Sequence, residues 1–320
     1  MAVFTPVSEA TLTSLLARFD LGQLTGFEGI ASGIENTNYF VDTTQGRFVL
    51  TLFEKLSAHE LPFYLGMMRH LADKGVACPK PMADRTGQIL QVCESKPAAI
   101  ATRLKGQGQP RPSPVHCQIL GAAIAQSHIA VTDYAGSQPN LRGLSWWQET
   151  VPKILPFLSG AQKTLLEDEL AAQTAFAQTA LSKGLPKGAV HADIFCDNVL
   201  FEETPQGPVL GGFIDFYFAG VDQFVFDLAV AANDWCIDRS ETDTGALDAA
   251  NVNALLAGYN SVRSLADAEK TAWPMALRAA AYRFWVSRLY DWHLPRAAAM
   301  LTPKDPAHFE RLLIARREGR

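Results

Sequence analysis

The stretch HADIFCDNVLF (residues 191–201) places one histidine, two aspartates and one asparagine within eight positions and then runs into apolar residues. A turn-forming segment, EETPQG, and a second apolar run, PVLGGFIDF, follow it. This order predicts a β-hairpin with its loop near residues 204–206. Since the first strand of a hairpin starts beside the end of the second, we expect Asn198 and Asp215 to meet at one end of the sheet. Asp193 reaches the same end from the preceding loop.

Three oxygen-bearing side chains gathered in this way carry two negative charges, a costly arrangement unless a cation or a proton offsets them. Carboxylate and amide oxygens suit Mg²⁺, which keeps its other positions for water and phosphate oxygens. In protein kinases, an HxDxxxxN loop supplies an Asp, which accepts the proton of the attacking hydroxyl, and an Asn, which binds the metal. A second Asp, directly before Phe on the next hairpin strand, also binds the metal. His191, Asp193 and Asn198 match the first element, and Asp215-Phe216 matches the second. The sequence therefore predicts a phosphoryl-transfer site.

Two further residues near this site are expected to have structural roles. His191 is interpreted as a structural residue of the loop rather than as a base. Asp227, in FVFDLAVA, is interpreted as a brace for the catalytic loop. The alternative for Asp227 is a carboxylate at a helix N-terminus, where the helix dipole favours negative charge.

The composition indicates a globular protein with two lobes. The chain has 320 residues, more than one compact core usually holds, with 48% apolar and 19% charged residues. The net charge is −5 and the basic residues do not cluster, so neither nucleic acid nor an anionic membrane is an expected partner. The five cysteines are scattered without a CxxC pair, which predicts a reducing compartment and neither disulfides nor a zinc site. Without a signal-like N-terminus or a long apolar run, the expected location is the cytoplasm.

The best boundary in the chain is GQGQPRPSP (residues 106–114), where three prolines and two glycines end both helix and sheet. Residues 1–105 are predicted to form an N-lobe of antiparallel strands and helices, with one helix after Ser8 and a second one capped by Ser57 and Glu60. Residues 115–320 are predicted to form a mainly helical lobe around the catalytic loop and hairpin. The helices are expected at 115–130, 145–158, 161–183, 224–237, 246–262 and 267–292.

A nucleotide needs donors for its phosphates and an edge for adenine. The bend between the first strands can present main-chain N–H groups to phosphate, and the strand before the boundary can offer main-chain groups to adenine. The candidate nucleotide-binding residues are Ser32, Gly33, Asn36, Thr37, Asn38, Thr51, Ala99 and Ala101. GxxxxGK[ST], GxGxxG after a strand, and GxSxG are all missing from the sequence, which argues against the folds that carry them.

Further segments extend the match over nearly the whole chain: SGIENTNYFV, FVLTLFE, LPFYLGMMRHLADKGV, NDWC and RFWVSRLYD. With them the sequence resembles the aminoglycoside phosphotransferase and choline kinase superfamily, small-molecule kinases with the protein kinase fold, and within it is similar to the kinase-fold homoserine kinases. The resemblance implies an α+β, protein-kinase-like two-lobe fold. It also implies transfer of the γ-phosphoryl group of ATP to the side-chain hydroxyl of L-homoserine, a step towards threonine. By motif match, Asp193 would be the catalytic base, and Asn198 and Asp215 would bind Mg²⁺.

One position departs from the superfamily pattern, because Thr51 stands where a strand lysine pairs the α- and β-phosphates. Lys55, just beyond the strand, is a hypothetical substitute, and a surface lysine is the alternative interpretation. The phosphate contacts of the N-lobe are therefore an open point of the sequence.

An amino-acid substrate needs a cation for its carboxylate and an anion for its ammonium group. Arg283 is the predicted carboxylate ligand and Asp234 the predicted ammonium ligand, while Tyr217 and Trp235 either line the pocket or pack in the core. Arg288 lies five residues beyond Arg283, on a different side of a helix, so at most one of the two is expected to face the site. Two alternatives remain: a related kinase for choline, methylthioribose, an aminoglycoside or a hexosamine, and a catalytically silent nucleotide-binding module.

Overall fold

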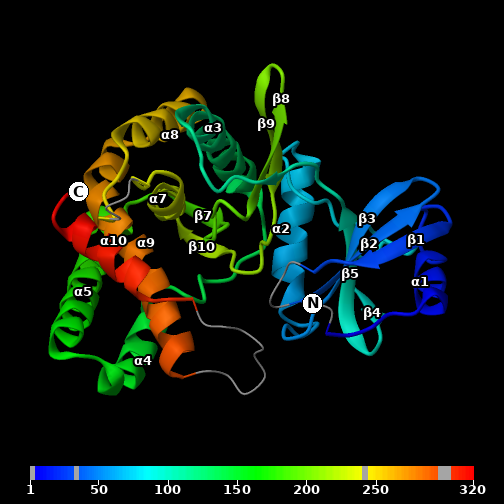
Figure 1. Ribbon diagram of the computed structural model, residues 1–320, viewed down its shortest axis with the longest axis horizontal. Coiled ribbons are helices and arrows are strands. Elements are labelled where there is room, and N and C mark those ends of the chain that lie inside the picture. Colours follow the sequence, from blue (N-terminus) through cyan, green and yellow to red (C-terminus); the bar gives the residue numbers. More distant parts are fainter. Residues whose placement is uncertain (1–3, 32–35, 240–243, 295–303) are drawn as a thin grey trace. The chain divides into compact units, whose positions relative to one another are not determined.

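The computed structural model describes residues 4–31, 36–239, 244–294 and 304–320. The chain forms two compact units (Figure 1). Unit 1 comprises Met1–Gly106 and Gly211–Ile214, and unit 2 comprises Gln107–Leu210 and Asp215–Arg320. Within the described ranges, no helix combines the length and the apolar character needed to cross a bilayer.

Unit 1 is built on a five-stranded sheet of order β1-β2-β3-β5-β4, in which every neighbouring pair is antiparallel. Figure 1 shows helices α1 and α2 flanking this sheet. The elements are α1 (Glu9–Leu16), β1 (Leu24–Gly29), β2 (Thr37–Thr43), β3 (Gly46–Leu52), α2 (Leu61–Asp73), β4 (Gln91–Cys93) and β5 (Lys96–Thr102). The antiparallel sheet with helices and the two predicted hairpins are confirmed. The β4–β5 turn has positive φ at Glu94 and Ser95, which suits the twist of a tight hairpin.

The predicted first helix begins as expected, because the side chain of Ser8 accepts a hydrogen bond from Thr11 N. Leu12, Leu15 and Leu16 of α1 belong to the apolar core of unit 1, together with inward residues of the strands. The second helix starts differently from the prediction. Glu60 does accept hydrogen bonds from Ser57, but this contact closes a turn ahead of α2, which begins at Leu61.

Unit 2 is mainly helical, with two small groups of strands. Its helices are α3 (Pro114–Ala130), η1 (Val131–Asp133), α4 (Leu144–Ile154), η2 (Leu155–Phe157), α5 (Gly160–Gln178), α6 (Ala180–Lys183), α7 (Phe224–Trp235), α8 (Ala249–Val262), α9 (Asp267–His293) and α10 (Ala307–Arg317). Its strands are β6 (Gln107–Gly108), β7 (Lys187–Val190), β8 (Val199–Thr204), β9 (Gly207–Phe213) and β10 (Gly220–Gln223). The β8–β9 hairpin confirms the prediction made from residues 204–206. The last residues of β9 belong to unit 1.

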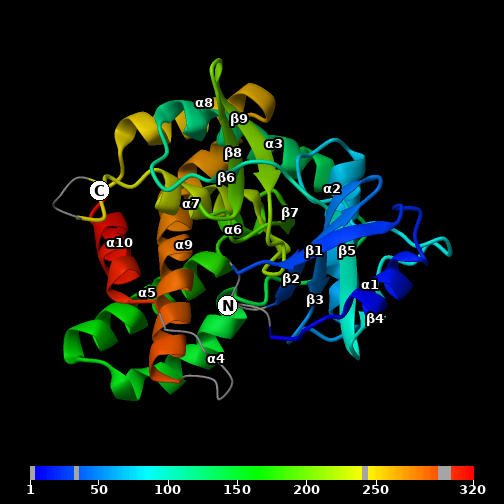
Figure 2. The same ribbon diagram turned by 45° about the vertical axis from the view of Figure 1, so that its right-hand side comes forward.

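Helices α3 and α8 lie side by side, and α9 packs against α7, α10 and α4 (Figure 2). The α3–α8 contact depends on two glycines. A Cβ atom added at Gly121 would lie 2.0 Å from Leu255 O, and one added at Gly258 would lie 1.9 Å from Gln118 O. The two backbones therefore approach more closely than any side chain allows.

Three local features differ from the sequence prediction. The segment 161–183 is two helices rather than one, because Thr179 ends α5 and its side chain caps α6 by accepting from Ser182 N. The segment 106–114 is not purely linker, since it contains β6, which pairs with β8. Strand β10 and helix α10 were not predicted; β10 is short and pairs antiparallel with β7.

Candidate active site

The loop that carries the opening motif follows β7, which pairs with β10 beside α7 (Figure 1). After Val190 the chain passes through His191 and Ala192 into Asp193. Ala192 has φ 61°, a left-handed conformation that costs a residue with a Cβ about 1–2 kcal/mol. The ring of buried His191 packs at 4.5 Å from the ring of Phe216, which follows Asp215. The loop is thus strained locally and has to be held by its surroundings.

Asp227 of α7 holds this strained turn. One carboxylate oxygen accepts from Ala192 N at 2.7 Å, and the other accepts from His191 N at 3.1 Å and is hydrogen-bonded to His128 Nε2 at 3.1 Å. The side chain is 2% exposed, so these bonds form away from water. Because a carboxylate oxygen only accepts, Nε2 of His128 carries the shared hydrogen.

The support continues behind His128 through a chain of buried polar groups. His128 Nδ1 is hydrogen-bonded to the hydroxyl of Tyr259 at 2.8 Å, and Arg263 donates to the same hydroxyl at 2.7 Å. Arg263 also donates to both carboxylate oxygens of Glu269, at 3.0 and 3.1 Å. Nothing in the sequence points to His128, Tyr259, Arg263 or Glu269, because they come from three helices that local patterns do not relate.

A second pair of residues on α7 supports the loop further along. Asp234 lies two turns after Asp227 on the same face of the helix. Its carboxylate accepts from Cys196 N at 2.6 Å, and the indole N–H of Trp235 donates to Ile194 O at 3.1 Å. Helix α7 is therefore hydrogen-bonded to the loop both before and after Asp193.

Trp235 was one of the two predicted pocket-lining aromatics. The structure places it fully inside the core, with no exposed surface and with its only donor already paired. Packing, the alternative interpretation, fits this position. Tyr217 is half-buried and lies two residues beyond Asp215.

Asp193 and Asn198 lie directly against each other. The amide Nδ2 of Asn198 donates to Asp193 Oδ2 and to Asp193 O, both at 2.9 Å. These two bonds orient the amide so that Oδ1 of Asn198 is left as an acceptor pointing away from Asp193. Asp193 is 8% exposed and Asn198 is half-buried.

Asp215 approaches the same loop from the end of the hairpin. It follows β9, has φ 62°, and its side chain is exposed. Asp215 and Asp197 both act electrostatically on Asp193, as does Arg283. The hairpin therefore brings Asp193, Asn198 and Asp215 into one neighbourhood.

Burial raises the pKa of Asp193 to about 7, and the negative charges of Asp215 and Asp197 act in the same direction. Arg283 and the hydrogen bond from Asn198 oppose this shift. The raised pKa of Asp193 thus arises first from burial, which disfavours the charged carboxylate, and only second from the neighbouring negative charges.

The donor set fits Mg²⁺ rather than a transition metal. Among the described residues there is no cluster of three or more His, Cys, Asp or Glu side chains that would form a complete metal site. Instead, the Oδ1 atom of Asn198 and the carboxylate of Asp215 offer two hard oxygen ligands beside excess negative charge. Mg²⁺ is typically held by few protein oxygens and completes its shell with water and phosphate oxygens.

Two arginines of α9 interact electrostatically with acidic residues of this loop. Arg283 is 3% exposed, and its charge interacts with that of Asp193. Arg288 interacts with Asp234, Asp193 and Asp197. Five residues separate the two side chains by about 140° around the helix axis.

The candidate nucleotide residues of unit 1 have mixed outcomes. Ser32 and Gly33 lie outside the described residues, and Asn36 is half-buried just before β2. Thr37 is fully buried, and its hydroxyl accepts from Phe4 N and Thr5 N and donates to Glu54. The side chain of Thr37 is thus used inside the unit, and the predicted contact of this bend with phosphate through main-chain N–H groups stays a prediction.

Asn38 and Thr51 are cross-strand partners in β2 and β3, and the Thr51 hydroxyl donates to Asn38 Oδ1 at 2.7 Å. The position of the missing strand lysine is therefore occupied by a hydroxyl–amide pair. Lys55 is exposed.

Ala99 and Ala101, predicted to offer main-chain groups to adenine, lie within the sheet. They pair with Thr51 and Val49 of β3, and the alternate residues of β5 bond on its other side, where Ile100 O accepts from Met82 N. Both edges of β5 are thus used by the sheet, since an interior strand has no spare donors or acceptors. The predicted role of these two alanines in binding adenine stays a prediction.

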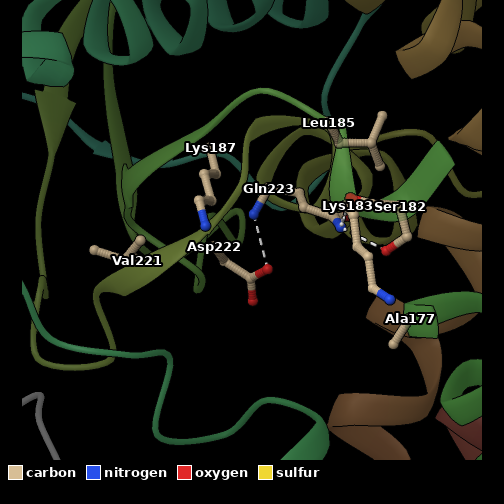
Figure 3. Close-up of a pocket in the computed structure, with 8 residues that line it drawn as sticks. All are labelled: Ala177, Ser182, Lys183, Leu185, Lys187, Val221, Asp222 and Gln223. Carbon is tan, nitrogen blue, oxygen red and sulfur yellow. Dashed lines mark hydrogen bonds between the residues drawn. The ribbon is translucent and has the colours of Figure 1, made fainter. Parts of the chain in front are cut away.

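A separate pocket lies at the other end of the β7–β10 ribbon, where Lys187 pairs with Gln223, rather than at the Val190 end that leads into the catalytic loop. Lys183, Lys187 and Asp222 line it (Figure 3). The carboxylate of Asp222 is already bound by the Asn140 amide and by Gln223 N. This pocket has no part in the site around Asp193.

Comparisons with known proteins point to the same chemistry as the geometry of this site. A family model described as "Phosphotransferase enzyme family" matches residues 26–265. A protein of Paraburkholderia phymatum named homoserine kinase is 52% identical, and the alignment covers 100% of this chain and 99% of that protein. A protein of Polaromonas naphthalenivorans with the same name is 51% identical, with 99% and 98% coverage.

Among solved structures, the amicoumacin kinase hAmiN in complex with AMP-PNP, Ca²⁺ and Ami resembles this chain with a TM-score of 0.69. The match covers 97% of this chain and 92% of that one, at 16% sequence identity. At this identity the similarity concerns the fold, which is that of a protein-kinase-like phosphotransferase.

Proposed function

Because this chain belongs to the phosphotransferase enzyme family, we propose that it transfers the γ-phosphoryl group of ATP to the side-chain hydroxyl of L-homoserine, with Mg²⁺ as the metal ion. The observation that carries the choice of substrate is the full-length identity of about one half to proteins named homoserine kinase. The observation that supports the chemistry is the grouping of Asp193, Asn198 and Asp215 at the end of the hairpin. The product, O-phospho-L-homoserine, is an intermediate towards threonine.

In the proposed reaction the homoserine hydroxyl oxygen forms a bond to the γ-phosphorus, and the bond from that phosphorus to the β–γ bridging oxygen breaks to release ADP. The hydroxyl proton passes to a carboxylate oxygen of Asp193. Asn198 Oδ1 and the Asp215 carboxylate would hold Mg²⁺, which supplies positive charge to the phosphate oxygens. Asn198 has a second role, because its amide hydrogen bonds fix the orientation of the Asp193 carboxylate.

The supports described for the loop have a place in this proposal. Asp227 keeps Ala192 in its left-handed conformation, which points Asp193 out of β7 and towards the site. Positioning of this kind matters because a displacement of about 1 Å at a reacting group can cost about 10²-fold in rate. The free oxygen of Asp234 is the candidate acceptor for the substrate ammonium group, and Tyr217 is the candidate wall of the acceptor site.

The proposal is tested by measuring ADP release by the purified protein with a panel of hydroxyl acceptors: L-homoserine, L-serine, L-threonine, choline, methylthioribose, a hexosamine and an aminoglycoside. L-homoserine is expected to give the highest kcat/KM, and phosphorus NMR should identify a phosphate monoester of its side chain. Chelation of Mg²⁺ should abolish turnover. A higher kcat/KM for another acceptor would replace homoserine as the substrate, and turnover of none would refute the enzyme itself.

The base is tested with Asp193→Asn, which removes the proton acceptor and keeps the size of the side chain. Turnover should fall by about 10²–10⁴-fold, while the affinity for ATP is retained. Asp197→Asn is the matched control, since it removes a neighbouring exposed carboxylate of the same loop. Turnover of Asp193→Asn equal to that of Asp197→Asn would contradict the assigned role.

A further inference from the structure

Arg283 of α9 is a buried cation, and some of its hydrogen-bond donors are unused among the described residues. The residue is 3% exposed, and its Nε and Nη2 atoms have no hydrogen-bond partner among the described residues. A buried guanidinium in this state carries its desolvation cost without the compensating bonds that normally accompany it. Such an arrangement is unfavourable in the free protein, and it therefore indicates a ligand that completes it.

A second arginine of the same helix shows what these two donors are suited to bind. Arg278 uses its Nε and Nη2 atoms on the carboxylate of Glu169, with Nε 3.1 Å from Oε1 and Nη2 2.6 Å from Oε2. This two-point contact is the geometry in which a guanidinium edge matches a carboxylate. Arg283 presents the same two atoms, but in its case no protein carboxylate is bound to them.

The surroundings of Arg283 fix its plane and keep it charged. Its Cζ atom lies 3.9 Å from the ring centroid of Phe284 and 5.1 Å from that of Phe218. Aromatic rings stabilise a cation through their faces and leave its edge open. Burial lowers the pKa of Arg283 to about 10, which keeps the side chain positive at neutral pH. Arg142 adds a second positive charge to this region.

Arg283 is also at a suitable place relative to the catalytic carboxylate. Its charge and that of Asp193 stabilise each other, yet within the part of the chain that the structure describes no ion pair joins them. A substrate with an anionic end on the arginine and a hydroxyl at the aspartate would use both groups. Arg288 is less suited, because it donates to Asp305 O and stacks on Phe309.

We infer that Arg283 binds the α-carboxylate of the acceptor through Nε and Nη2, and thereby makes the site selective for hydroxy-amino acids over the corresponding amino alcohols. This inference rests on the proposed function for the reaction that the acceptor undergoes. The anion site itself follows from the buried, unpartnered guanidinium.

The test compares two acceptors that differ only by a carboxylate, L-homoserine and 3-aminopropan-1-ol, in the wild type and in Arg283→Met. Methionine keeps a long side chain between Phe218 and Phe284 and removes the charge. The loss of a two-point charged contact should lower kcat/KM for homoserine by about 10²–10³-fold. The activity with 3-aminopropan-1-ol should change little, so that the preference of the wild type for homoserine disappears.

Arg317→Met is the matched control, because Arg317 lies on α10 in a long ion pair with Asp168 at 3.8 Å. It should keep the wild-type preference. Equal losses with both acceptors in Arg283→Met would overturn the inference, since a guanidinium that supports the fold or contacts the transferred phosphoryl group affects both acceptors alike.

A binding measurement separates this inference from the proposed function. L-homoserine should raise the unfolding temperature of the wild type and not that of Arg283→Met, while 3-aminopropan-1-ol should not distinguish the two proteins. Without ligand, Arg283→Met should be at least as stable as the wild type, because it removes an unpartnered buried charge. Binding through Arg283 without turnover would refute the proposed function alone. A wild type that shows no stabilisation by homoserine would refute the inference.

Discussion

Asp227→Asn is the substitution that best tests how the catalytic loop is held. It replaces one carboxylate oxygen by an amide NH₂ and leaves the shape of the side chain unchanged. In the wild type one oxygen accepts from Ala192 N and the other from His191 N, and the latter also bonds His128. Either orientation of the asparagine amide therefore sets an NH₂ group against a main-chain N–H. No rotation of the side chain avoids this conflict.

The size of the effect follows from these contacts. One charge-assisted hydrogen bond is lost, worth about 1.5–3 kcal/mol, and one buried main-chain N–H is left unsatisfied, at a cost of about 1–3 kcal/mol. Together they predict a decrease of about 2.5–6 kcal/mol in the free energy of unfolding of unit 2. Because Ala192 is then no longer held at positive φ, Asp193 should move, and turnover should fall by about 10²-fold.

Urea unfolding followed by tryptophan fluorescence measures the first effect in the right part of the chain, because all six tryptophans lie in residues 146–292, within unit 2. Asp267→Asn is the control. It makes the same chemical change at a side chain that is 99% exposed, and its ion pair with Lys270 should be worth less than about 1 kcal/mol. An unchanged unfolding midpoint for Asp227→Asn would refute the bracing role. A lowered midpoint with normal turnover would refute the link from Asp227 to Asp193.

Two further substitutions test contacts that position the elements of each unit. Gly258→Ala should destabilise unit 2 by about 1–3 kcal/mol in the same urea experiment, because its Cβ atom would overlap Gln118 O. The control Gly160→Ala has open space around the added Cβ atom and should be near neutral, so equal effects of the two substitutions would contradict the close approach of α3 and α8. Thr37→Val should destabilise unit 1 by about 1–3 kcal/mol, because it removes a hydroxyl that accepts two main-chain N–H bonds and donates to Glu54. Circular dichroism during unfolding measures this change. A stability equal to that of the wild type would mean that these bonds contribute nothing.

Local pattern predicted most of the secondary structure. Periods of three and four residues located the long helices of unit 2, and alternating apolar residues located the hairpins of unit 1. Helix α10 was missed although Phe309, Leu312 and Leu313 carry the same spacing after Pro306. Strand β10 had no comparable signal. It has four residues and forms only because β7, some thirty residues earlier, supplies its hydrogen bonds.

Within the site, the residues close in sequence were the easiest to relate. Asp193 and Asn198 are five residues apart in one loop, and a hairpin of ordinary length predicts the approach of Asp215. The sequence did not show which side chains and main-chain groups already have a partner within the fold. Thr37 is used by the N-terminal segment, and Ala99 and Ala101 are used by the neighbouring strands. The sequence does not reveal these hydrogen-bond partners, because each partner lies far along the chain.

The amino-acid sequence by itself determined the chemistry available to this protein: a loop with a carboxylate and an amide at fixed spacing, a hairpin that returns a second carboxylate, and helices rich in apolar residues. These features depend on contacts between near neighbours, which the covalent chain enforces. Only the tertiary structure decided which buried groups find partners. Asp227 binds the backbone of the loop from helix α7, while two donors of buried Arg283 have no hydrogen-bond partner among the described residues. Whether a buried polar group has a hydrogen-bond partner depends on every element packed around it. A group with partners supports the fold, and a group without them is available to a ligand.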